Sequence, residues 1–285
     1  MAETSLELVL KRDRIIVLAG LLLIALVAWG YLFYQARAMQ RMNATGTNMA
    51  GMDMHGKDMH DMDMKQMDMP MNVVTPQTRL WGTGDLLLIF VMWAVMMVAM
   101  MVPSAAPMIL VFTAFNRKQW ARDRPYVPTG IFLLGYLVIW IAFSAIAASG
   151  QWMLHRAALL SAMMVSTSAL FAGALLIAAG VFQWTPLKNT CLSHCRTPLS
   201  FFSSHWREGR AGAFSMGLRH GAYCVGCCWV LMSLLFVAGV MNLYWVAILS
   251  IFILLEKTLP PRISDWTARV AGVLLAGWGT WMILN

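Results

Sequence analysis

A tract rich in methionine, histidine and aspartate lies in the first third of the chain. Between Met49 and Met71 it holds nine methionines, two histidines and five aspartates. Thioether sulfur is a soft, uncharged donor, so this Met/His/Asp tract favours Cu(I) or Ag(I), and Cu(II) where imidazole helps. A stretch this polar cannot bury itself, so packing does not explain its methionines. The alternative is a disordered linker of biased composition. The predicted metal-capture residues are Met52, Met54, His55, Met59, His60, Met62, Met64, Met67 and Met69.

Thiols form a second group of soft ligands, in the C-terminal half of the chain. His220, Cys224, Cys227 and Cys228 occur within nine residues of a long apolar run. On a helix of about 3.6 residues per turn, these four side chains fall within an arc of about 100°. Such a polar face should turn inward, away from lipid, where it could hold a metal ion. Cys-x2-Cys spacing also serves thiol–disulfide exchange, so a metal site and a redox site both stay open.

Cys191 and Cys195 form a Cys-x3-Cys pair before that run, in a segment expected to be a cytoplasmic loop. In a reducing compartment, the pair is expected to bind metal rather than to form a disulfide. Cu(I) is satisfied by two or three thiolates, and the bound metal favours their deprotonation. The pair is therefore predicted to exchange an ion with a cytoplasmic carrier.

A stripe of methionines follows another apolar run. Methionine is common core filler, and that alternative stays open. Pro103 and Pro107, just beyond the stripe, are expected to kink or break the helix. Each proline leaves one backbone carbonyl without its helical hydrogen bond. A bilayer tolerates such carbonyls where they face protein or a water-filled cavity, so a broken helix beside soft ligands suits an ion path. The predicted path comprises Met96, Met97, Met100 and Met101.

Membrane helices must position these ligands. The chain has 285 residues, of which 60% are apolar and 12% charged, whereas a globular chain carries about 25% charged residues. A membrane-spanning helix needs about 20 apolar residues. We therefore predict an all-α fold, a polytopic membrane bundle of about seven transmembrane helices, at roughly 15–34, 84–115, 128–150, 158–183, 211–238, 240–257 and 266–284.

The distribution of basic residues predicts the orientation of this bundle. Lysine and arginine concentrate before the first predicted span and after the second, fourth and sixth. Loops rich in these residues stay in the cytoplasm, so the N-terminus is predicted inside and the C-terminus outside, in a bacterial inner membrane. Arg219, Glu256 and Lys257 are expected near the inner interface, with their long side chains reaching water. Orientation explains the net charge of +8, and no nucleic-acid partner is expected.

Three parts follow from this organisation: an N-terminal anchor (1–34), an extracytoplasmic tract (35–80) and a six-helix body (81–285). The first span could instead be a cleaved signal peptide, because Ala36-Arg37-Ala38 resembles a processing site. Its apolar run exceeds the roughly 7–15 residues of a signal, which favours a retained anchor. The sequence contains neither a Gly-x4-Gly-Lys-Ser/Thr phosphate loop nor an Asp-Lys-Thr-Gly motif, so ATP hydrolysis is not expected and the chain is not predicted to be an enzyme.

The six-helix body contains several distinctive short motifs. They are Trp93-Ala-Val-Met-Met-Val-Ala-Met-Met-Val-Pro103, Cys191-Leu-Ser-His-Cys-Arg-Thr-Pro198, His220-Gly221 and Tyr223-Cys-Val-Gly-Cys-Cys-Trp-Val-Leu-Met232. This set resembles a bacterial family of predicted metal-binding integral membrane proteins. The resemblance covers about residues 81–285 and implies metal binding at the five cysteines, together with His220. The Met/His/Asp tract is similar to the copper-binding tracts of periplasmic copper-resistance proteins.

Soft ligands at the outside, in the membrane and at the inside predict a copper-handling protein. It would capture Cu(I) or Ag(I) and transfer it, or transport it across the membrane. Zinc is less expected, because it gains little from thioethers. The alternatives are a membrane thiol–disulfide oxidoreductase and a metallochaperone that assembles a cuproenzyme. Expected partners are membrane lipid and a periplasmic or cytoplasmic copper carrier, while the oligomeric state stays open.

Overall fold

The computed structural model describes residues 5–50, 83–120, 127–156, 168–240 and 242–284. Every element in these ranges is a helix, so the predicted all-α class is confirmed for them. The helices are α1 (Ser5–Ala50), α2 (Thr83–Trp120), α3 (Thr129–Arg156), α4 (Ala169–Phe182), α5 (Pro186–Arg196), α6 (Pro198–His205), α7 (Gly209–Ser233), α8 (Leu235–Ala238), α9 (Leu243–Thr258) and α10 (Pro261–Leu284).

The apolar runs correspond to helices of membrane length, which indicates a membrane protein. Among the described residues, five stretches are long and apolar enough to cross a bilayer: Arg12–Ala38, Gly84–Arg117, Thr129–Arg156, Gly209–Ala238 and Pro261–Leu284. The pair α4 and α5, bent by 63° at a short break, makes a sixth span if it is counted as one. The predicted run at 240–257 corresponds to α9, whose 16 residues fall short of the roughly 20 that a span requires. The count of seven and the inward N-terminus stay predictions.

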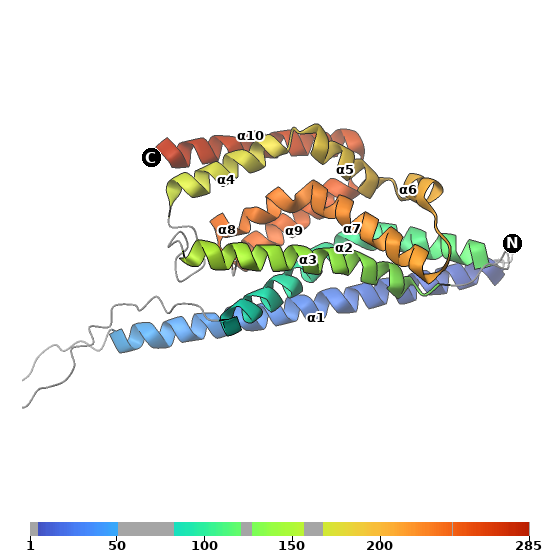
Figure 1. Ribbon diagram of the computed structural model, residues 1–285, viewed down its shortest axis with the longest axis horizontal. Helices are drawn as coiled ribbons and strands as arrows, with labels where there is room; N and C mark the ends of the chain where they lie inside the picture. Colours follow the sequence, from blue (N-terminus) through green and yellow to red (C-terminus); the bar gives the residue numbers. More distant parts are fainter. Residues whose placement is uncertain (1–4, 51–82, 121–126, 157–167, 241, 285) are drawn as a thin grey trace, which may run out of the picture.

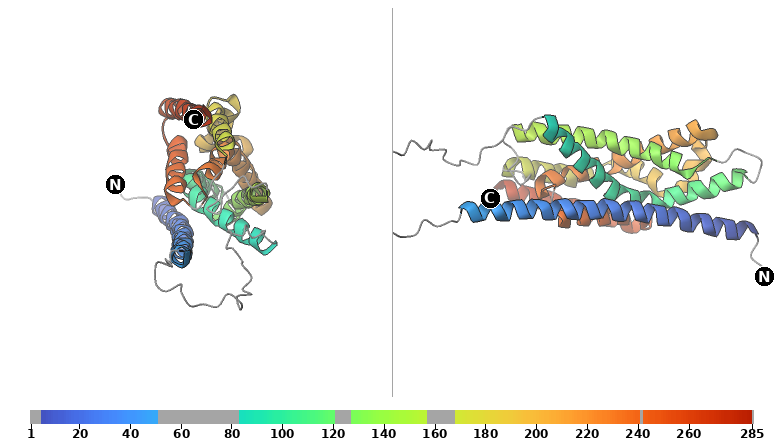
Figure 2. Two further views of the ribbon diagram at one scale, coloured as in Figure 1. Left: turned by 90° about the vertical axis from the view of Figure 1, so that its left-hand side faces the viewer. Right: turned by 90° about the horizontal axis from the view of Figure 1, so that it is seen from below.

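The helices run back and forth along one axis, with the two chain termini at opposite ends (Figure 1). Helix α1 lies on the outside of the bundle, against α2 (Figure 2). It continues to Ala50, well past the predicted anchor boundary at residue 34. The Arg117 guanidinium donates to both Asp13 carboxylate oxygens and so joins α2 to α1. Many α1 side chains, including Leu22 and Leu26, remain exposed, as suits a lipid-facing helix.

Helix α2 passes through both of its prolines. The sequence predicted a kink or a break there, but α2 is one helix from Thr83 to Trp120, with Pro103 and Pro107 inside it. Its path is bent rather than interrupted (Figure 2). Ser104, between the prolines, donates to the Met101 carbonyl at 2.9 Å, and the Tyr136 hydroxyl of α3 donates to the same carbonyl. The predicted kink is therefore present as a bend (Figure 2), and the alternative of a break is wrong, because α2 continues through both prolines.

Glycines let pairs of helices approach closely. A Cβ atom at Gly217 of α7 would collide with the Phe132 carbonyl of α3. Likewise, a Cβ atom at Gly180 of α4 would lie 2.6 Å from the Gly272 carbonyl of α10. Small residues allow such backbone contact between membrane helices, where the hydrophobic effect does not drive association. The α3–α7 and α4–α10 pairs are thereby fixed side by side, and both matter for the positions of the thiols.

Candidate metal centre

The three thiols of α7 are buried in the middle of the bundle. Cys224 is 0% exposed, and Cys227 and Cys228 are nearly as enclosed. The Cys227 and Cys228 thiols both donate to the Cys224 carbonyl, at 3.1 and 2.8 Å. All five cysteines are free. The inward orientation that the helical spacing predicts is therefore confirmed.

The other two cysteines belong to the same site. Cys191 and Cys195 were predicted in a loop, but they lie on α5, which begins with Pro186 at a favoured first helical position. Residues four apart share a helix face, so both cysteines face α7. The Cys195 thiol lies close enough to the Cys224 and Cys227 thiols to interact with both.

Gly226 admits Cys191 to this contact. A Cβ atom at Gly226 would lie 2.8 Å from the Cys191 Sγ atom, so a larger residue there would displace the Cys191 thiol from its place against α7. The five cysteines thus form one thiol cluster, Cys191, Cys195, Cys224, Cys227 and Cys228, between α5 and α7. The sequence predicted Cys191 and Cys195 in a loop, as a site apart from the three cysteines of the membrane helix. In the structure, all five lie together.

Aromatic rings surround His220, one helical turn before the thiols. Its ring lies against Tyr136 and Phe132, with centroids 5.4 and 6.1 Å away, and Phe201 closes another side. His220 is 2% exposed, and its Nδ1 atom has no hydrogen-bond partner in the described part of the chain. A buried nitrogen without a partner is costly. His220 therefore remains a candidate ligand beside the cluster.

Three residues that the sequence reasoning did not select converge on Cys224. The Lys257 ammonium donates to the Cys224 Sγ atom and to the Ser104 hydroxyl, both at 2.9 Å. The Tyr136 hydroxyl lies 3.1 Å from the same sulfur and donates to the Met101 carbonyl. The expectation that Lys257 and Glu256 reach water was wrong, because both are buried. Two consecutive charges at the end of an apolar helix were the signal that could have identified them.

The predicted methionine path is buried beside this site. Met96, Met97, Met100 and Met101 are each at most 1% exposed. The Met101 carbonyl accepts from both Tyr136 and Ser104, which places this end of the stripe next to the residues around Cys224. Burial fits a role in packing as well as a role as ligands, so the path stays a prediction. The residues of the Met/His/Asp tract from Met52 to Met69 lie outside the described residues.

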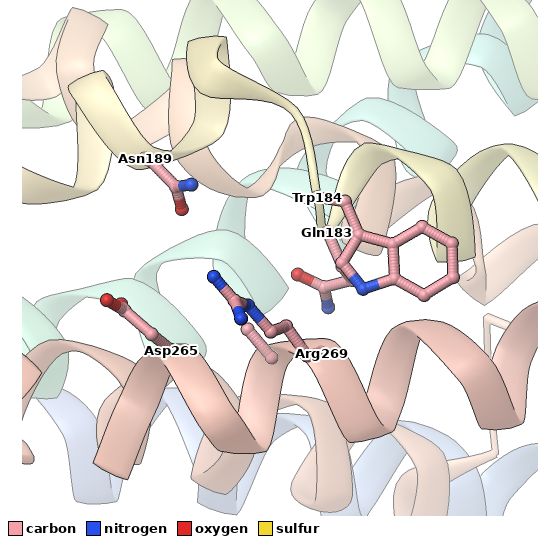
Figure 3. A pocket seen from close by; sticks show the side chains of 6 residues that line it. Gln183, Trp184, Asn189, Asp265 and Arg269 are labelled. Atoms are coloured by element: carbon pink, nitrogen blue, oxygen red, sulfur yellow. The ribbon is translucent and has the colours of Figure 1, made fainter. Parts of the chain in front are cut away.

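A second polar group lies where α4 bends into α5. Lys188 is fully buried and pairs with Glu256 at 2.5 Å, and it also donates to Gln183. Gln183 borders a cavity of about 300 Å³ that Trp184, Asn189, Asp265, Ala268 and Arg269 also line (Figure 3). This group contains no thiol. It anchors α5 and α9 and so holds Cys195 and Lys257 in place.

The donor set suits a soft monovalent ion. No group of three or more His, Cys, Asp or Glu side chains within the described ranges has the arrangement of a finished metal site. Instead, the Cys227 and Cys228 thiols donate to the Cys224 carbonyl. Thiolate sulfur binds Cu(I) and also Zn(II), and Cu(I) requires as few as two sulfurs. Side-chain rotation of neighbouring cysteines would therefore be enough to form a site.

A family comparison agrees with this chemistry. The family model described as PpoB2, copper chaperone, matches residues 90–282, about two thirds of the chain. The chain belongs to the PpoB2 copper chaperone family. The matched region holds the whole thiol cluster, His220 and Lys257, whereas α1 and the Met/His/Asp tract precede it. No curated protein and no solved structure matches the chain. Membership of PpoB2 supports the predicted handling of copper, and it makes copper the cargo to be tested at the thiol cluster.

Proposed function

We propose that this protein is a membrane copper chaperone that holds Cu(I) at the thiol cluster and delivers it to another protein. The observation that carries this proposal is the convergence of five cysteines from α5 and α7 in the core of a chain of the PpoB2 family. Sulfur ligands suit Cu(I), the family match favours copper over other soft ions, and burial protects the ion from water and oxidants. Transfer to a partner then proceeds by exchange of one thiolate for another.

The predicted topology assigns each group of ligands a stage. With the N-terminus inside, the Met/His/Asp tract lies outside the membrane and gathers Cu(I) or Ag(I) weakly at many equivalent thioethers. Met96, Met97, Met100 and Met101 lead inward to Cys224. Chaperoning is favoured over transport across the membrane because the family is one of copper chaperones. If the protein instead transported copper, Cu(I) would move into or out of sealed vesicles that contain it.

Metal analysis of the purified full chain tests the proposal. The wild-type protein, loaded with Cu(I) under anaerobic reducing conditions, should retain copper after gel filtration. Cys224→Ser/Cys227→Ser should lose most of it, because two thiols of the cluster are replaced by poor Cu(I) ligands. Met216→Leu is the matched control, since it removes a buried sulfur of α7 outside the cluster and conserves volume. Copper retention by the double variant equal to that of the wild type would place the site elsewhere.

A cellular experiment separates the chaperone from its alternatives. Deleting the gene should leave total cell copper unchanged while a copper-dependent enzyme loses its metal and its activity. A change in total copper would support transport instead. A stable disulfide in the purified protein, with no copper bound, would support the thiol–disulfide oxidoreductase.

A further inference from the structure

The Lys257 side chain is buried beside the thiol cluster. It is 9% exposed, and no ion pair joins it to a carboxylate among the residues that the structure describes. The other buried lysine, Lys188, pairs with Glu256. An isolated charge in a low-dielectric interior is strongly unfavourable unless an opposite charge accompanies it.

The groups that contact the Lys257 ammonium are a thiol sulfur and a hydroxyl. Its nitrogen lies 2.9 Å from the Cys224 Sγ atom and 2.9 Å from the Ser104 Oγ atom. Ser104 donates its own proton to the Met101 carbonyl, so its oxygen is free to accept from the ammonium. Of these two partners, the sulfur is the one that becomes an anion when a metal binds.

The geometry points to Lys257 as the counter-cation of a Cu(I) complex held by two thiolates, one of which is Cys224. This inference rests on the proposed function and specifies the charge of the cargo. A Cu(I) ion with two thiolates carries one negative charge, which the ammonium cancels, so the buried assembly is neutral. A divalent ion with the same two thiolates is already neutral, and the ammonium would then remain uncompensated.

Metal competition on the full-length protein in detergent tests this role. Cu(I) affinity is measured against bicinchoninate under anaerobic conditions, and Ag(I) and Zn(II) are measured in parallel. Lys257→Gln should weaken Cu(I) and Ag(I) binding at least about tenfold, equivalent to about 1.4 kcal/mol. Zn(II) binding should stay unchanged or become tighter. Lys257→Arg restores the positive charge and should keep Cu(I) affinity within about threefold, or less than about 1 kcal/mol, of the wild type.

Two further variants separate charge from structural damage. Asp13→Asn/Arg117→Gln removes as a unit the ion pair between α1 and α2, which involves none of the helices of the thiol cluster, and should leave the Cu(I) affinity unchanged. Ser104→Ala removes the second partner of the ammonium and should reduce Cu(I) affinity less than Lys257→Gln does. Equal weakening of all three metals by Lys257→Gln, or equal losses in its Gln and Arg variants, would overturn the inference. A wild-type protein that binds no Cu(I) would instead contradict the proposed function.

Discussion

At the scale of single residues, Cys224 is the point at which four helices meet. It lies on α7 and contacts Cys195 of α5, Tyr136 of α3 and Lys257 of α9. The sequence identified the cysteines, because their spacing on one helix face is a local pattern. It missed Tyr136 and Lys257, which are separated from Cys224 by 88 and 33 residues. Contacts of this kind depend on how the helices pack and have no local signature.

The methionine stripe gives a prediction at the same scale. Met96→Leu/Met100→Leu conserves volume, so each swap should cost less than about 1.5 kcal/mol of stability. If the thioethers carry ions toward Cys224, the rate of Cu(I) loading should fall about fivefold, roughly 1 kcal/mol in the barrier. The equilibrium affinity of the thiol cluster should not change. Stopped-flow loading of the protein in vesicles measures the rate.

Met216→Leu/Met232→Leu on α7 is the control for this experiment, since it also replaces two buried methionines. Unchanged loading in the Met96→Leu/Met100→Leu variant would assign those methionines to packing alone.

At the scale of elements, the long apolar runs predicted the positions of most helices. The run at 128–150 corresponds to α3 (Thr129–Arg156), and the run at 84–115 lies within α2. Helix α5 was missed because its mixture of polar and thiol residues has no apolar run of membrane length. Its helical state follows from a Thr185 cap and Pro186, and its contact with α7 comes from tertiary packing. Hydropathy detects length and composition, but not a short helix that packs on another.

The glycine contact between α3 and α7 gives a prediction about these elements. Gly217→Ala would place a Cβ atom against the Phe132 carbonyl, so it should destabilise the protein by roughly 1–3 kcal/mol. The separation of α7 from α3 should also move Cys224 away from Tyr136 and weaken Cu(I) binding. Thermal unfolding in detergent and metal competition measure the two effects.

Gly150→Ala is the matched control on α3, where a Cβ atom would meet nothing within 4 Å. Replacing a helical glycine by alanine at an open position should stabilise the protein by about 0.5–1 kcal/mol. If both variants had the same stability, close packing at Gly217 would not contribute to the fold.

At the scale of the whole molecule, the protein combines a body shared with the PpoB2 family and a preceding Met/His/Asp tract outside the matched region. Composition predicted the membrane class, whereas the orientation derived from the pattern of basic residues stays a prediction. The association of the two cysteine segments was beyond sequence reasoning, since it requires the bend between α4 and α5.

Removal of the Met/His/Asp tract should separate capture from storage. Deleting residues 51–71 should reduce the copper loading of the protein in cells grown at low copper, because a dense array of weak ligands raises the local ion concentration. At high copper, the thiol cluster should fill to the same level as in the wild type. Copper content of the purified protein from both cultures measures this. Replacing the tract with a Gly/Ser linker of equal length controls for the loss of chain.

The close backbone contact at glycines within two helix pairs, α3–α7 and α4–α10, has a mechanical consequence. Because the backbones touch at these glycines, we expect α3–α7 and α4–α10 each to move as one stiff block. Cys224 belongs to the first block. Cys195 lies on α5, which is joined to α4 of the second block at the 63° bend between the two helices. The sulfur-to-sulfur separation is therefore set by the angle between the blocks. A docking protein that tilted one block against the other would loosen the grip on the ion without unfolding either.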